Sequence, residues 1–595
     1  MSKLEILKDG LLLDGEPFLL VGGDFHYFRT LKTGWRKRLE LMKDFGLTAV
    51  QVYVPWSYHE PKEGNFDFSG NLDLDEFLSL VEEYGMKIML RPSPYICAEV
   101  DFGAMPWWLL KNPDICFRCM DDTYIAAVDK YYDYLCKIIV PHLSTNGGGI
   151  IAVALENEYG SYGNDFEYIR HLQHKLEDNG VDVPFYTCDG DTLYFLKYGM
   201  LKDIWSCMDY RWDSKAAFAR HRELQPQFVP YASECWTCAN QRWDEPQIPR
   251  DLDEVVRSFK DALEDGGMFN FYMFAGGTNF GFTSGAARFG KYRPFCTSYD
   301  MESPITEYGA LTEKYFACRD VLDDFLNKPR RPHIYPKYEA QHVSVDITEY
   351  CDLLDNIDVI SSKTVESVNP KPMEYLDQGY GFILYSTTLN GPVNGKEVFK
   401  ILELHDRATL YLDGKYLGTM YRDRVHNPIA AEVDEGTRLD ILVENFGRLN
   451  FTEFDTERKG ILVGVTLGDH RIYHWKNRCL PMDETTQIPY SKIPKGGVRL
   501  NRPAFYRGFF DAKQGVDTFV DTVGWTKGFV RINGFNLGRY WRAGPQRTLY
   551  LPGELLKEKD NCIEFFDIHN PNLEYRAELL DRHILTQPTS ETDTI

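Results

Sequence analysis

The sequence lacks a long apolar run. None of its 595 residues lies in a stretch approaching the ~20 consecutive apolar residues that a membrane-spanning helix requires. Residues 1–10 alternate polar and apolar types and lead into a strand-like segment, without the apolar core of a secretory signal. We therefore expect a cytoplasmic protein with no membrane partner.

An excess of positive charge is also missing. The formal net charge is −23 at pH 7, which argues against nucleic acid as a partner. The 13 cysteines are odd in number and scattered through apolar segments, which favours reduced thiols over a disulfide framework. The two Cys-x-x-Cys pairs, Cys116/Cys119 and Cys235/Cys238, lack the separation of a zinc ribbon. We expect neither a metal nor a cofactor.

A glycine-rich phosphate-binding turn is absent too. Gly22-Gly23 follows the first strand-like segment, but no third glycine opens a helix there. What residues 1–330 do contain is eight strand-like segments, each followed by a helical pattern or a long loop. Such units close most naturally into a (β/α)8 TIM barrel, and a doubly wound open sheet is the alternative.

Two carboxylates stand out within this alternation. The apolar run 150–155 reads as a buried strand and ends at Glu156, Asn157 and Glu158. Strand alternation would place Glu156 and Glu158 on one face, unless the strand ends first. Counting strands puts Glu158 at the end of the fourth and Glu234 at the end of the seventh, on the same catalytic rim. Two such carboxylates suit double-displacement glycoside hydrolysis, although a solvated acidic loop would also explain the first pair.

Beyond residue 330 the helical patterns disappear. We assign residues 331–375, which begin in a proline-rich and charged stretch, to a linker. Short alternating stretches separated by turns such as Asp413-Gly414 then predict two all-β sandwich or jelly-roll domains, 376–490 and 491–595. The chain is thus expected to be a multidomain protein with an N-terminal TIM barrel.

A series of short segments follows one another along residues 1 to about 325: His26-Tyr27-Phe28-Arg29, Tyr53-Val54-Pro55-Trp56, Arg91-Pro92, Pro94-Tyr95-Ile96-Cys97-Ala98-Glu99, Glu156-Asn157-Glu158-Tyr159-Gly160, Ser233-Glu234, Tyr272-Met273-Phe274 and Thr297-Ser298-Tyr299-Asp300. Together and in this order they resemble the catalytic barrel of family 35 glycoside hydrolases, in particular exo-β-galactosidases of the bacterial intracellular type. Residues 528–541 and 544–552 of the second all-β domain are similar to the family's galactose-binding-like jelly rolls, where scaffolding is the alternative to sugar binding.

This resemblance implies a retaining mechanism with Glu158 as general acid/base and Glu234 as nucleophile. Tyr272 would hydrogen-bond the nucleophile or the ring oxygen of the sugar, and Glu156 would support the site. Core filling is the alternative for Tyr53 and Tyr272, and a salt bridge to Arg91 is the alternative for Glu99. The substrate-binding residues implied or favoured by position are Tyr53, Ile96, Cys97, Ala98, Glu99, Asn157, Tyr272, Tyr299, Trp236 and Trp243.

Several positions depart from the family's pattern and leave the identity of the sugar open. The departures are Asp24, Val100, Gly149, Ala154, Ala239 and Met301. A stacking tryptophan of the family is replaced at Ala239 and a sugar-contacting tyrosine at Met301, which could shift specificity by a few kcal/mol.

These observations favour a retaining exo-β-glycosidase that removes terminal non-reducing β-galactosyl residues from oligosaccharides. The same chemistry on another β-hexoside, as in a β-glucosidase, exo-glucosaminidase or transglycosylase, is the alternative. A non-catalytic carbohydrate-binding protein is a more remote one, because both Glu158 and Glu234 are present. The expected partner is a glycoside or oligosaccharide, and the chain could form a homo-oligomer.

Overall fold

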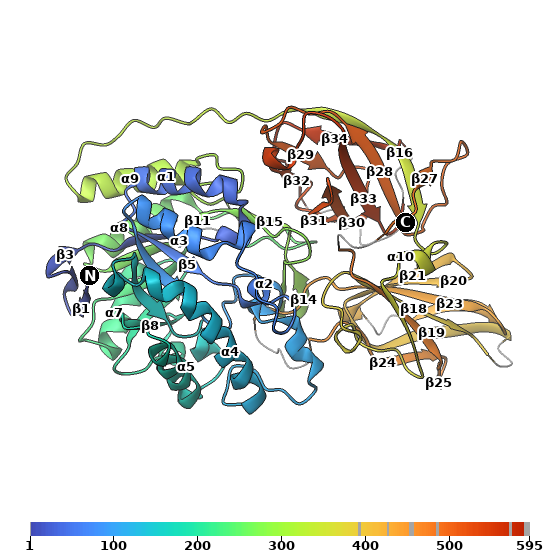
Figure 1. Ribbon diagram of the computed structural model, residues 1–595, viewed down its shortest axis with the longest axis horizontal. Coiled ribbons are helices and arrows are strands. Elements are labelled where there is room, and N and C mark those ends of the chain that lie inside the picture. The colour runs from blue at the N-terminus through green and yellow to red at the C-terminus, as the bar shows by residue number, and fades with distance from the viewer. Residues whose placement is uncertain are drawn as a thin grey trace.

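The computed structural model describes residues 2–237, 239–300, 302–390, 394–424, 428–451, 457–483, 487–570 and 574–587. Figure 1 shows a helix-covered barrel beside two β domains, one above the other. This arrangement confirms the predicted fold class.

Eight parallel strands close the barrel in chain order. They are β4 (Val21–Phe25), β5 (Ala49–Tyr53), β6 (Lys87–Arg91), β7 (Ile150–Ala154), β8 (Phe185–Gly190), β9 (Trp205–Tyr210), β10 (Tyr231–Trp236) and β11 (Met268–Ala275). The helices that follow them are α1 (Trp35–Phe45), α3 (Leu74–Glu83), α4 (Asp122–Ile139), α5 (Phe166–Asp178), α6 (Leu193–Gly199), α7 (Ser214–Leu224), α8 (Leu252–Glu264) and α9 (Glu313–Phe325), with a short α2 (Trp56–His59) after β5.

Local sequence explains these elements. All five residues of β7 are buried, as expected for a strand covered on both faces. Helix α4 begins where the Asp121 carboxylate accepts a hydrogen bond from the Tyr124 backbone, and α1 ends at Gly46, whose φ is 111°. The strands therefore form the inner layer and the amphipathic helices the outer one.

A small antiparallel sheet closes one end of the barrel. It consists of β1 (Leu4–Leu7), β2 (Gly10–Leu13) and β3 (Glu16–Phe18). Leu4 belongs to the same buried cluster as Ile151 inside the barrel, and the Val229 amide, just before β10, donates to Leu7. Because this sheet covers the amino ends of the strands, the carboxyl ends form the open side.

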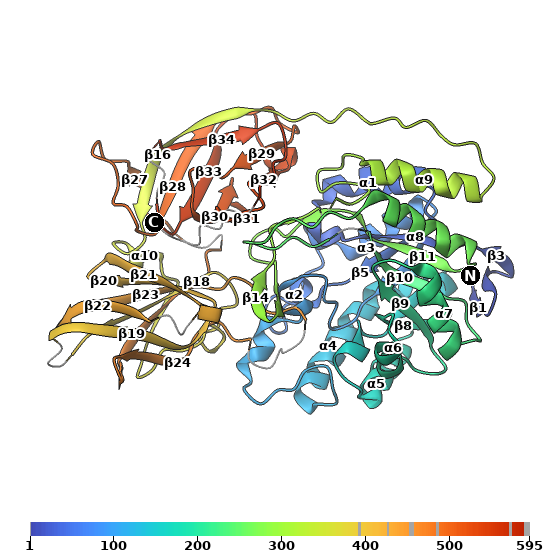
Figure 2. The same ribbon diagram turned by 180° about the vertical axis from the view of Figure 1, so that it is seen from behind.

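The loop after β11 carries additional strands. These are β12 (Gly277–Thr278) paired with β15 (Ser298–Tyr299), and the hairpin of β13 (Ala286–Phe289) and β14 (Lys291–Pro294). They lie between the barrel and the β domains (Figure 2).

The middle domain packs a six-stranded sheet against a four-stranded one, around its own core. The first sheet contains β17 (Lys363–Ser367), β26 (Trp475–Leu480), β18 (Phe382–Thr388), β23 (Arg438–Glu444), β20 (Arg407–Leu412) and β21 (Lys415–Tyr421). The second contains β22 (Ile429–Asp434), β19 (Asn394–His405), β24 (Gly460–Leu467) and β25 (His470–Arg471).

The last domain is all-β as well. Its strands are β16 (Val343–Asp352), β27 (Ser491–Lys492), β28 (Ala504–Phe510), β29 (Thr518–Asp521), β30 (Lys527–Ile532), β31 (Phe535–Trp541), β32 (Thr548–Leu551), β33 (Asn561–Asp567) and β34 (Arg576–Leu580).

Residues 331–375 are more than the linker that the sequence predicts. An extended segment leaves α9 and crosses to the last domain (Figures 1 and 2), where β16 pairs with β28 and β34. Helix α10 (Ile357–Ile360) and β17 follow, and β17 pairs with β26 of the middle domain. The middle domain is therefore inserted into the last one. β16 precedes the inserted domain in the chain, and it joins its sheet only through pairing with strands far away in the sequence. The pattern of residue types within β16 does not reveal that pairing.

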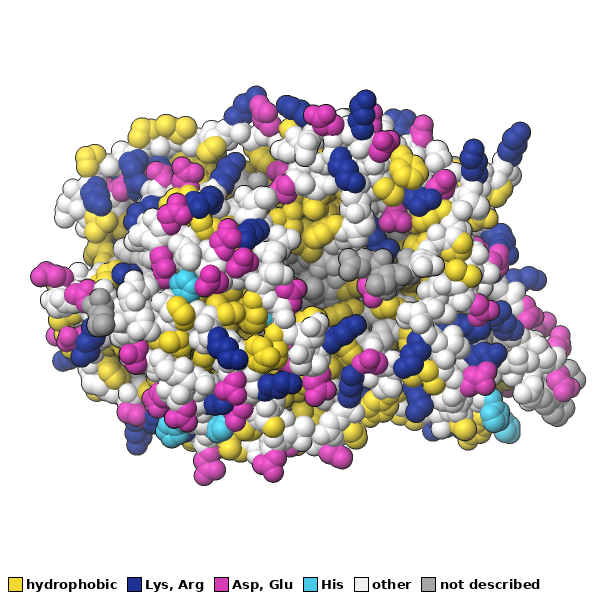
Figure 3. Space-filling model, viewed as in Figure 1, with side chains coloured by type: hydrophobic (Ala, Val, Ile, Leu, Met, Phe, Trp, Pro, Cys, Tyr) yellow, Lys and Arg dark blue, Asp and Glu magenta, His cyan; other side chains and the backbone are white. Residues whose placement is uncertain are grey.

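Both β domains contact the barrel loops. Arg448 of the middle domain forms an ion pair with Asp101 at 2.8 Å, and Arg539 of the last domain donates to the Ser284 hydroxyl at 2.8 Å. In the view of Figure 3, acidic and basic side chains are interspersed over the surface. In the part of the chain that the structure describes, no helix is long and apolar enough to span a membrane.

Candidate active site

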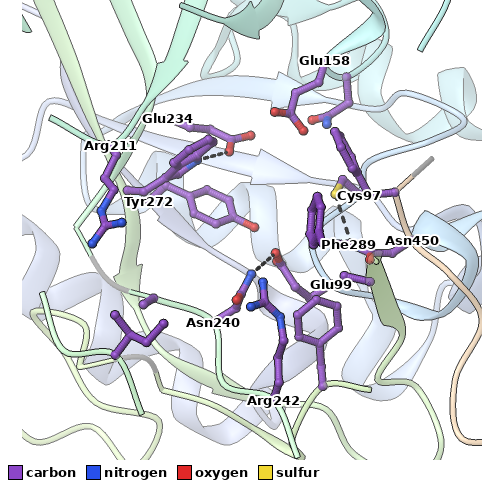
Figure 4. A pocket seen from close by; sticks show the side chains of 18 of the residues that line it. Cys97, Glu99, Glu158, Arg211, Glu234, Asn240, Arg242, Tyr272, Phe289 and Asn450 are labelled. Atoms are coloured by element: carbon purple, nitrogen blue, oxygen red, sulfur yellow. Dashed lines mark hydrogen bonds between the residues drawn. The ribbon is translucent and has the colours of Figure 1, made fainter. Parts of the chain in front are cut away.

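The carboxyl ends of the barrel strands surround a cavity of about 420 Å³ (Figure 4). It receives side chains from the ends of several strands, from the β13–β14 hairpin and from the middle domain. Its lining residues are Cys97, Ala98, Glu99, Asn157, Glu158, Arg211, Glu234, Trp236, Ala239, Asn240, Arg242, Ile248, Arg250, Tyr272, Ala287, Phe289, Phe295, Asn450 and Phe451.

Glu234 is held by three side chains. The Tyr53 hydroxyl donates to its Oε1, the Arg91 guanidinium lies 2.9 Å from the same oxygen, and the Trp236 indole donates to Oε2 at 3.0 Å. β10 continues two residues beyond Glu234, and its register with both neighbouring strands shifts around this residue. A shift of this kind can turn a side chain toward a site.

Glu158 has a different environment. β7 ends at Ala154, and Glu158 has a φ of 47°, while its amide donates to the Cys188 carbonyl at 2.9 Å. Burial, followed by the negative charge of Glu234, raises the pKa of the Glu158 carboxyl to about 8. The carboxyls of Glu158 and Glu234 both face the cavity (Figure 4). Glu158, which can hold a proton, therefore shares the cavity with Glu234, which has Arg91 as its cationic partner.

Glu156, unlike Glu158, does not line the cavity. Its carboxylate accepts two hydrogen bonds from Arg118, at 3.1 and 2.7 Å, and one from the Tyr168 hydroxyl at 2.9 Å. The φ of Glu156 is 63°, so extended alternation has already ended before the first carboxylate. Glu156 also accepts a hydrogen bond from the Asn157 amide at 2.7 Å, a contact that fits the supporting role implied by the resemblance.

Asn157 connects this support to the cavity. Its side-chain oxygen accepts a hydrogen bond from Arg91, and its carbonyl accepts one from Arg118 at 2.6 Å. Because Arg91 uses the asparagine oxygen, the amide nitrogen is the group of Asn157 that remains to donate to a sugar hydroxyl.

Glu99 belongs to a second network on the opposite wall. It accepts hydrogen bonds from the Tyr299 hydroxyl and from the Asn240 amide at 2.8 Å. The Tyr272 hydroxyl is 2.8 Å from that of Tyr299. The salt bridge to Arg91 weighed as an alternative for Glu99 is not what the structure shows, because Arg91 pairs with Glu234 instead.

Three family models match successive parts of this chain. The family model described as glycosyl hydrolases family 35 matches residues 10–325. The models for the first all-beta domain and the galactose-binding domain of beta-galactosidase match residues 370–482 and 503–561. The chain belongs to glycoside hydrolase family 35.

Mammalian members of the family are similar over most of this chain. The beta-galactosidase of Felis catus is 38% identical over 591 residues, covering 93% of this chain and 86% of the relative. That of Homo sapiens is 37% identical over 593 residues, covering 93% and 85%. A beta-galactosidase-1-like protein of Mus musculus is 37% identical, covering 97% and 91%. The chain is therefore a glycoside hydrolase.

Most of the sugar-binding residues predicted for this family 35 chain meet at the cavity. Tyr53 and Tyr299 are buried behind it and reach it through their bonds to Glu234 and Glu99. The residues that line it directly are Cys97, Ala98, Glu99, Asn157, Trp236 and Tyr272. The burial of Tyr53 and Tyr272 also fits the core-filling alternative.

Ile96 and Trp243 are the exceptions. Ile96 is buried in the barrel core next to the cavity wall, and its amide donates to the Gly103 carbonyl at 2.9 Å. Trp243 does not line this cavity. It packs with Phe446 and Trp541 where the three domains meet, and lines a separate cavity of about 300 Å³. Trp243 is close to Glu234 in the sequence, which is why a role in substrate binding was predicted for it. The loop between the two residues places Trp243 at the domain junction instead.

Sequence reasoning missed the roles of several residues at the cavity or behind its wall. Arg91 does not line the cavity, and the sequence suggested it only as a partner of Glu99, whereas it pairs with Glu234. Asn450 and Phe451 come from the middle domain, and nothing in their local sequence places them at the barrel. The basic residues Arg211, Arg242 and Arg250 carry no motif either.

The departures from the family's pattern fall in different places. Ala239 lines the cavity, whereas Asp24 is fully buried beneath it and accepts hydrogen bonds from Gln51 at 3.0 Å and Asn270 at 2.8 Å. Met301 lies outside the described residues, as does Cys238 of one Cys-x-x-Cys pair. Within the described part of the chain, no group of three or more His, Cys, Asp or Glu side chains is arranged to hold a metal.

Proposed function

We propose that this chain is a retaining exo-β-galactosidase that releases terminal β-galactosyl residues by double displacement. The observation that carries the proposal is the unequal environment of two facing carboxyls. Glu158 has a pKa raised to about 8 by burial and by the charge of Glu234, whereas Glu234 has a guanidinium at 2.9 Å. This difference provides a proton donor, Glu158, facing a carboxylate that is paired with a buried cation.

In the first step Glu158 donates its proton to the glycosidic oxygen while a Glu234 oxygen attacks the anomeric carbon. The bond to the leaving group breaks and a covalent glycosyl–Glu234 ester forms. Burial favours the uncharged acid before the reaction, and its proton leaves with the alcohol. The Asn157 amide would stabilise this transition state through the hydroxyl beside the reacting carbon.

In the second step a water molecule enters where the alcohol has left. Glu158, now ionised, accepts a proton from that water, and the resulting hydroxyl attacks the anomeric carbon. The ester bond breaks, so Glu234 returns to its ionised form beside Arg91. Two inversions at the same carbon give net retention.

The architecture around the cavity supports exo action. One wall is built by Asn450 and Phe451 of the middle domain and another by the β13–β14 hairpin, which together limit a long chain passing through. Galactose as the terminal sugar is supported by the names of the relatives. A second candidate function is the same chemistry on another β-hexoside. It is supported by Ala239 in the cavity wall, at a position where the family has a stacking tryptophan.

A mechanism-based label tests the proposal. A 2-deoxy-2-fluoro-β-galactoside with a good leaving group should modify Glu234, identified by mass spectrometry of the peptide. Labelling of another residue would overturn the assignment of the nucleophile. A panel of 4-nitrophenyl β-glycosides should show the highest kcat/KM for the galactoside, and a higher value for a glucoside or N-acetylglucosaminide would favour the second candidate. Proton NMR of the first product should show the β anomer.

We also propose a reducing, cytoplasmic compartment. The support is that every described cysteine is a free thiol, including the exposed Cys116. Localisation of a tagged full-length chain in its source cells tests this, and recovery outside the cytoplasm would contradict it.

A further inference from the structure

A second cavity lies where the barrel loops and the two β domains meet, and we call it the junction cavity. Its volume is about 300 Å³. Its lining residues are Trp243, Asp244, Glu245, Lys291, Tyr292, Pro294, Asp406, Arg407, Tyr421, Arg422, Asp423, Phe446 and Trp541. The first six belong to the barrel, the last one to the last domain, and the others to the middle domain. Because all three domains supply side chains, none of them forms this cavity alone.

The junction cavity is separate from the carboxylate cavity, which contains Glu158 and Glu234. The two linings have no residue in common. The β13–β14 hairpin, which lies between the barrel and the β domains (Figure 2), contributes Phe289 to the carboxylate cavity and Lys291 to the junction cavity. Lys291 and Asp423 are exposed, so small solutes can reach the junction cavity from the solvent.

Two buried hydrogen-bond donors line the junction cavity without an acceptor. The side chains of Trp243 and Trp541 are only 2% and 5% exposed. Neither indole N–H has a hydrogen-bond partner among the described residues. Buried donors are normally paired, because a donor that loses water without gaining an acceptor costs free energy. Two such donors on one cavity indicate a ligand that carries acceptor oxygens.

Much of the remaining lining is aromatic or apolar. The Tyr421 and Trp541 rings are stacked with their centres 6.2 Å apart, and Phe446 meets Trp541 edge-on at 5.5 Å. Pro294 adds a further apolar surface. Walls of this kind pack against C–H groups, while the two indole donors require oxygens. A sugar ring carries both kinds of group.

The charges around the junction cavity favour a ligand without net charge. The lining contains three basic and four acidic residues, so neither sign prevails. Asp406 already lies 2.8 Å from the Lys459 ammonium group. The Lys527 ammonium lies 3.2 Å from the centre of the Phe446 ring, so a cation of the protein already uses that ring face. An additional buried charge would therefore lack a partner and would cost free energy.

From these contacts we infer that the junction cavity binds one neutral sugar ring, whose oxygens accept hydrogen bonds from the indole N–H groups of Trp243 and Trp541. A volume of about 300 Å³ is at the lower end of the range for small-molecule sites, which suits one ring rather than an oligosaccharide. The inference goes beyond the proposed function, because the junction cavity contains neither Glu158 nor Glu234.

Tryptophan variants of the full-length protein test the site. Titration calorimetry with galactose should show binding that is weakened about tenfold or lost in Trp243→Phe and in Trp541→Phe, because each change removes an indole N–H and keeps an aromatic ring. Neither tryptophan lines the carboxylate cavity, so binding there is common to all variants. Trp525→Phe is the matched control and should leave binding unchanged. The Trp525 N–H is also buried without a partner among the described residues, but its ring stacks on Phe565 at 4.1 Å in the core of the last domain.

A matched set of sugars tests the chemical class of the ligand. Galactose is neutral, galacturonate carries a carboxylate, and galactosamine carries an ammonium group at neutral pH. For the binding that depends on the two tryptophans, we expect both charged sugars to bind at least about tenfold more weakly than galactose. Tighter binding of either charged sugar would overturn the assignment of a neutral ligand.

A crystal of the unaltered protein soaked in galactose provides a measurement that needs no variant. We expect density for one sugar ring within hydrogen-bond distance of the Trp243 and Trp541 indole nitrogens. A junction cavity that holds only water would overturn the inference. Galactose binding that is the same in the unaltered protein and in both tryptophan variants, each shown to be folded by its melting temperature, would overturn it as well.

Discussion

The Arg91 guanidinium lies 2.9 Å from Oε1 of Glu234, and both side chains are buried. The same guanidinium donates to the Asn157 side chain. Because Arg91 ends β6, while Asn157 follows β7 and Glu234 lies in β10, one cation joins three separate strands of the barrel. It offsets part of the cost of burying a carboxylate and orients the neighbouring amide.

Replacing Arg91 should impair both activity and stability. For Arg91→Met we expect kcat to fall by about 10²-fold or more, because the nucleophile loses its electrostatic partner. An unpaired buried carboxylate should also cost about 3–5 kcal/mol, seen as a lower melting temperature by circular dichroism. Arg36→Met is the control, since Arg36 pairs with Glu83 at the surface and should change little. Normal kinetics in Arg91→Met would contradict this role.

Activity should decline on the alkaline side. The pKa of Glu158 is raised to about 8, so the carboxyl keeps its proton below that pH and loses it above. We expect kcat/KM for an alkyl β-galactoside to fall as pH rises through about 8, approaching tenfold per pH unit. Glu158→Gln should lack this alkaline limb when assayed with an activated aryl glycoside that needs no proton. An alkaline limb retained in that variant would assign it to another group.

The Arg118–Glu156 pair should stabilise the loop that carries Asn157. Both side chains are buried, and two hydrogen bonds join them. Arg118→Met alone should cost about 3–5 kcal/mol, because it leaves a buried carboxylate unpaired. Adding Glu156→Leu should recover part of that loss, since neither charge is then buried alone. Melting temperatures of the two single variants and the double variant measure this coupling, and additive losses would contradict it.

The middle domain should affect substrate binding. Arg448 pairs with Asp101 of the barrel, and two residues further on the Asn450 carbonyl accepts a hydrogen bond from Tyr95 at 2.6 Å. For Arg448→Met we expect KM to rise by about tenfold with a smaller change in kcat, because the loop loses its position beside the cavity. Arg438→Met, which removes an arginine paired with Asp440 within the same domain, should leave KM unaltered. Equal KM values in the two variants would argue against this function of the loop.

Much of the fold could be predicted from local sequence. The fully buried run of β7, the helix end at Gly46 and the alternation of strands and helices are consequences of residue type within a few positions. The insertion of the middle domain was not predictable in that way. β16 is assigned to its sheet by pairing with β28 and β34, more than a hundred residues away.

For the site, the sequence by itself determined the approximate place of Glu158 and Glu234, because strand counting puts both on the carboxyl rim. Their chemical roles come from the family resemblance and belong to the proposal. The tertiary structure decided their environments. Burial beside another carboxyl raises the pKa of Glu158, while Arg91 from a third strand faces Glu234. It also separated Glu156 from Glu158, moved Trp243 to the domain junction and brought Asn450 to the cavity. Burial and charge pairing arise between segments far apart in the chain, so no local pattern contains them.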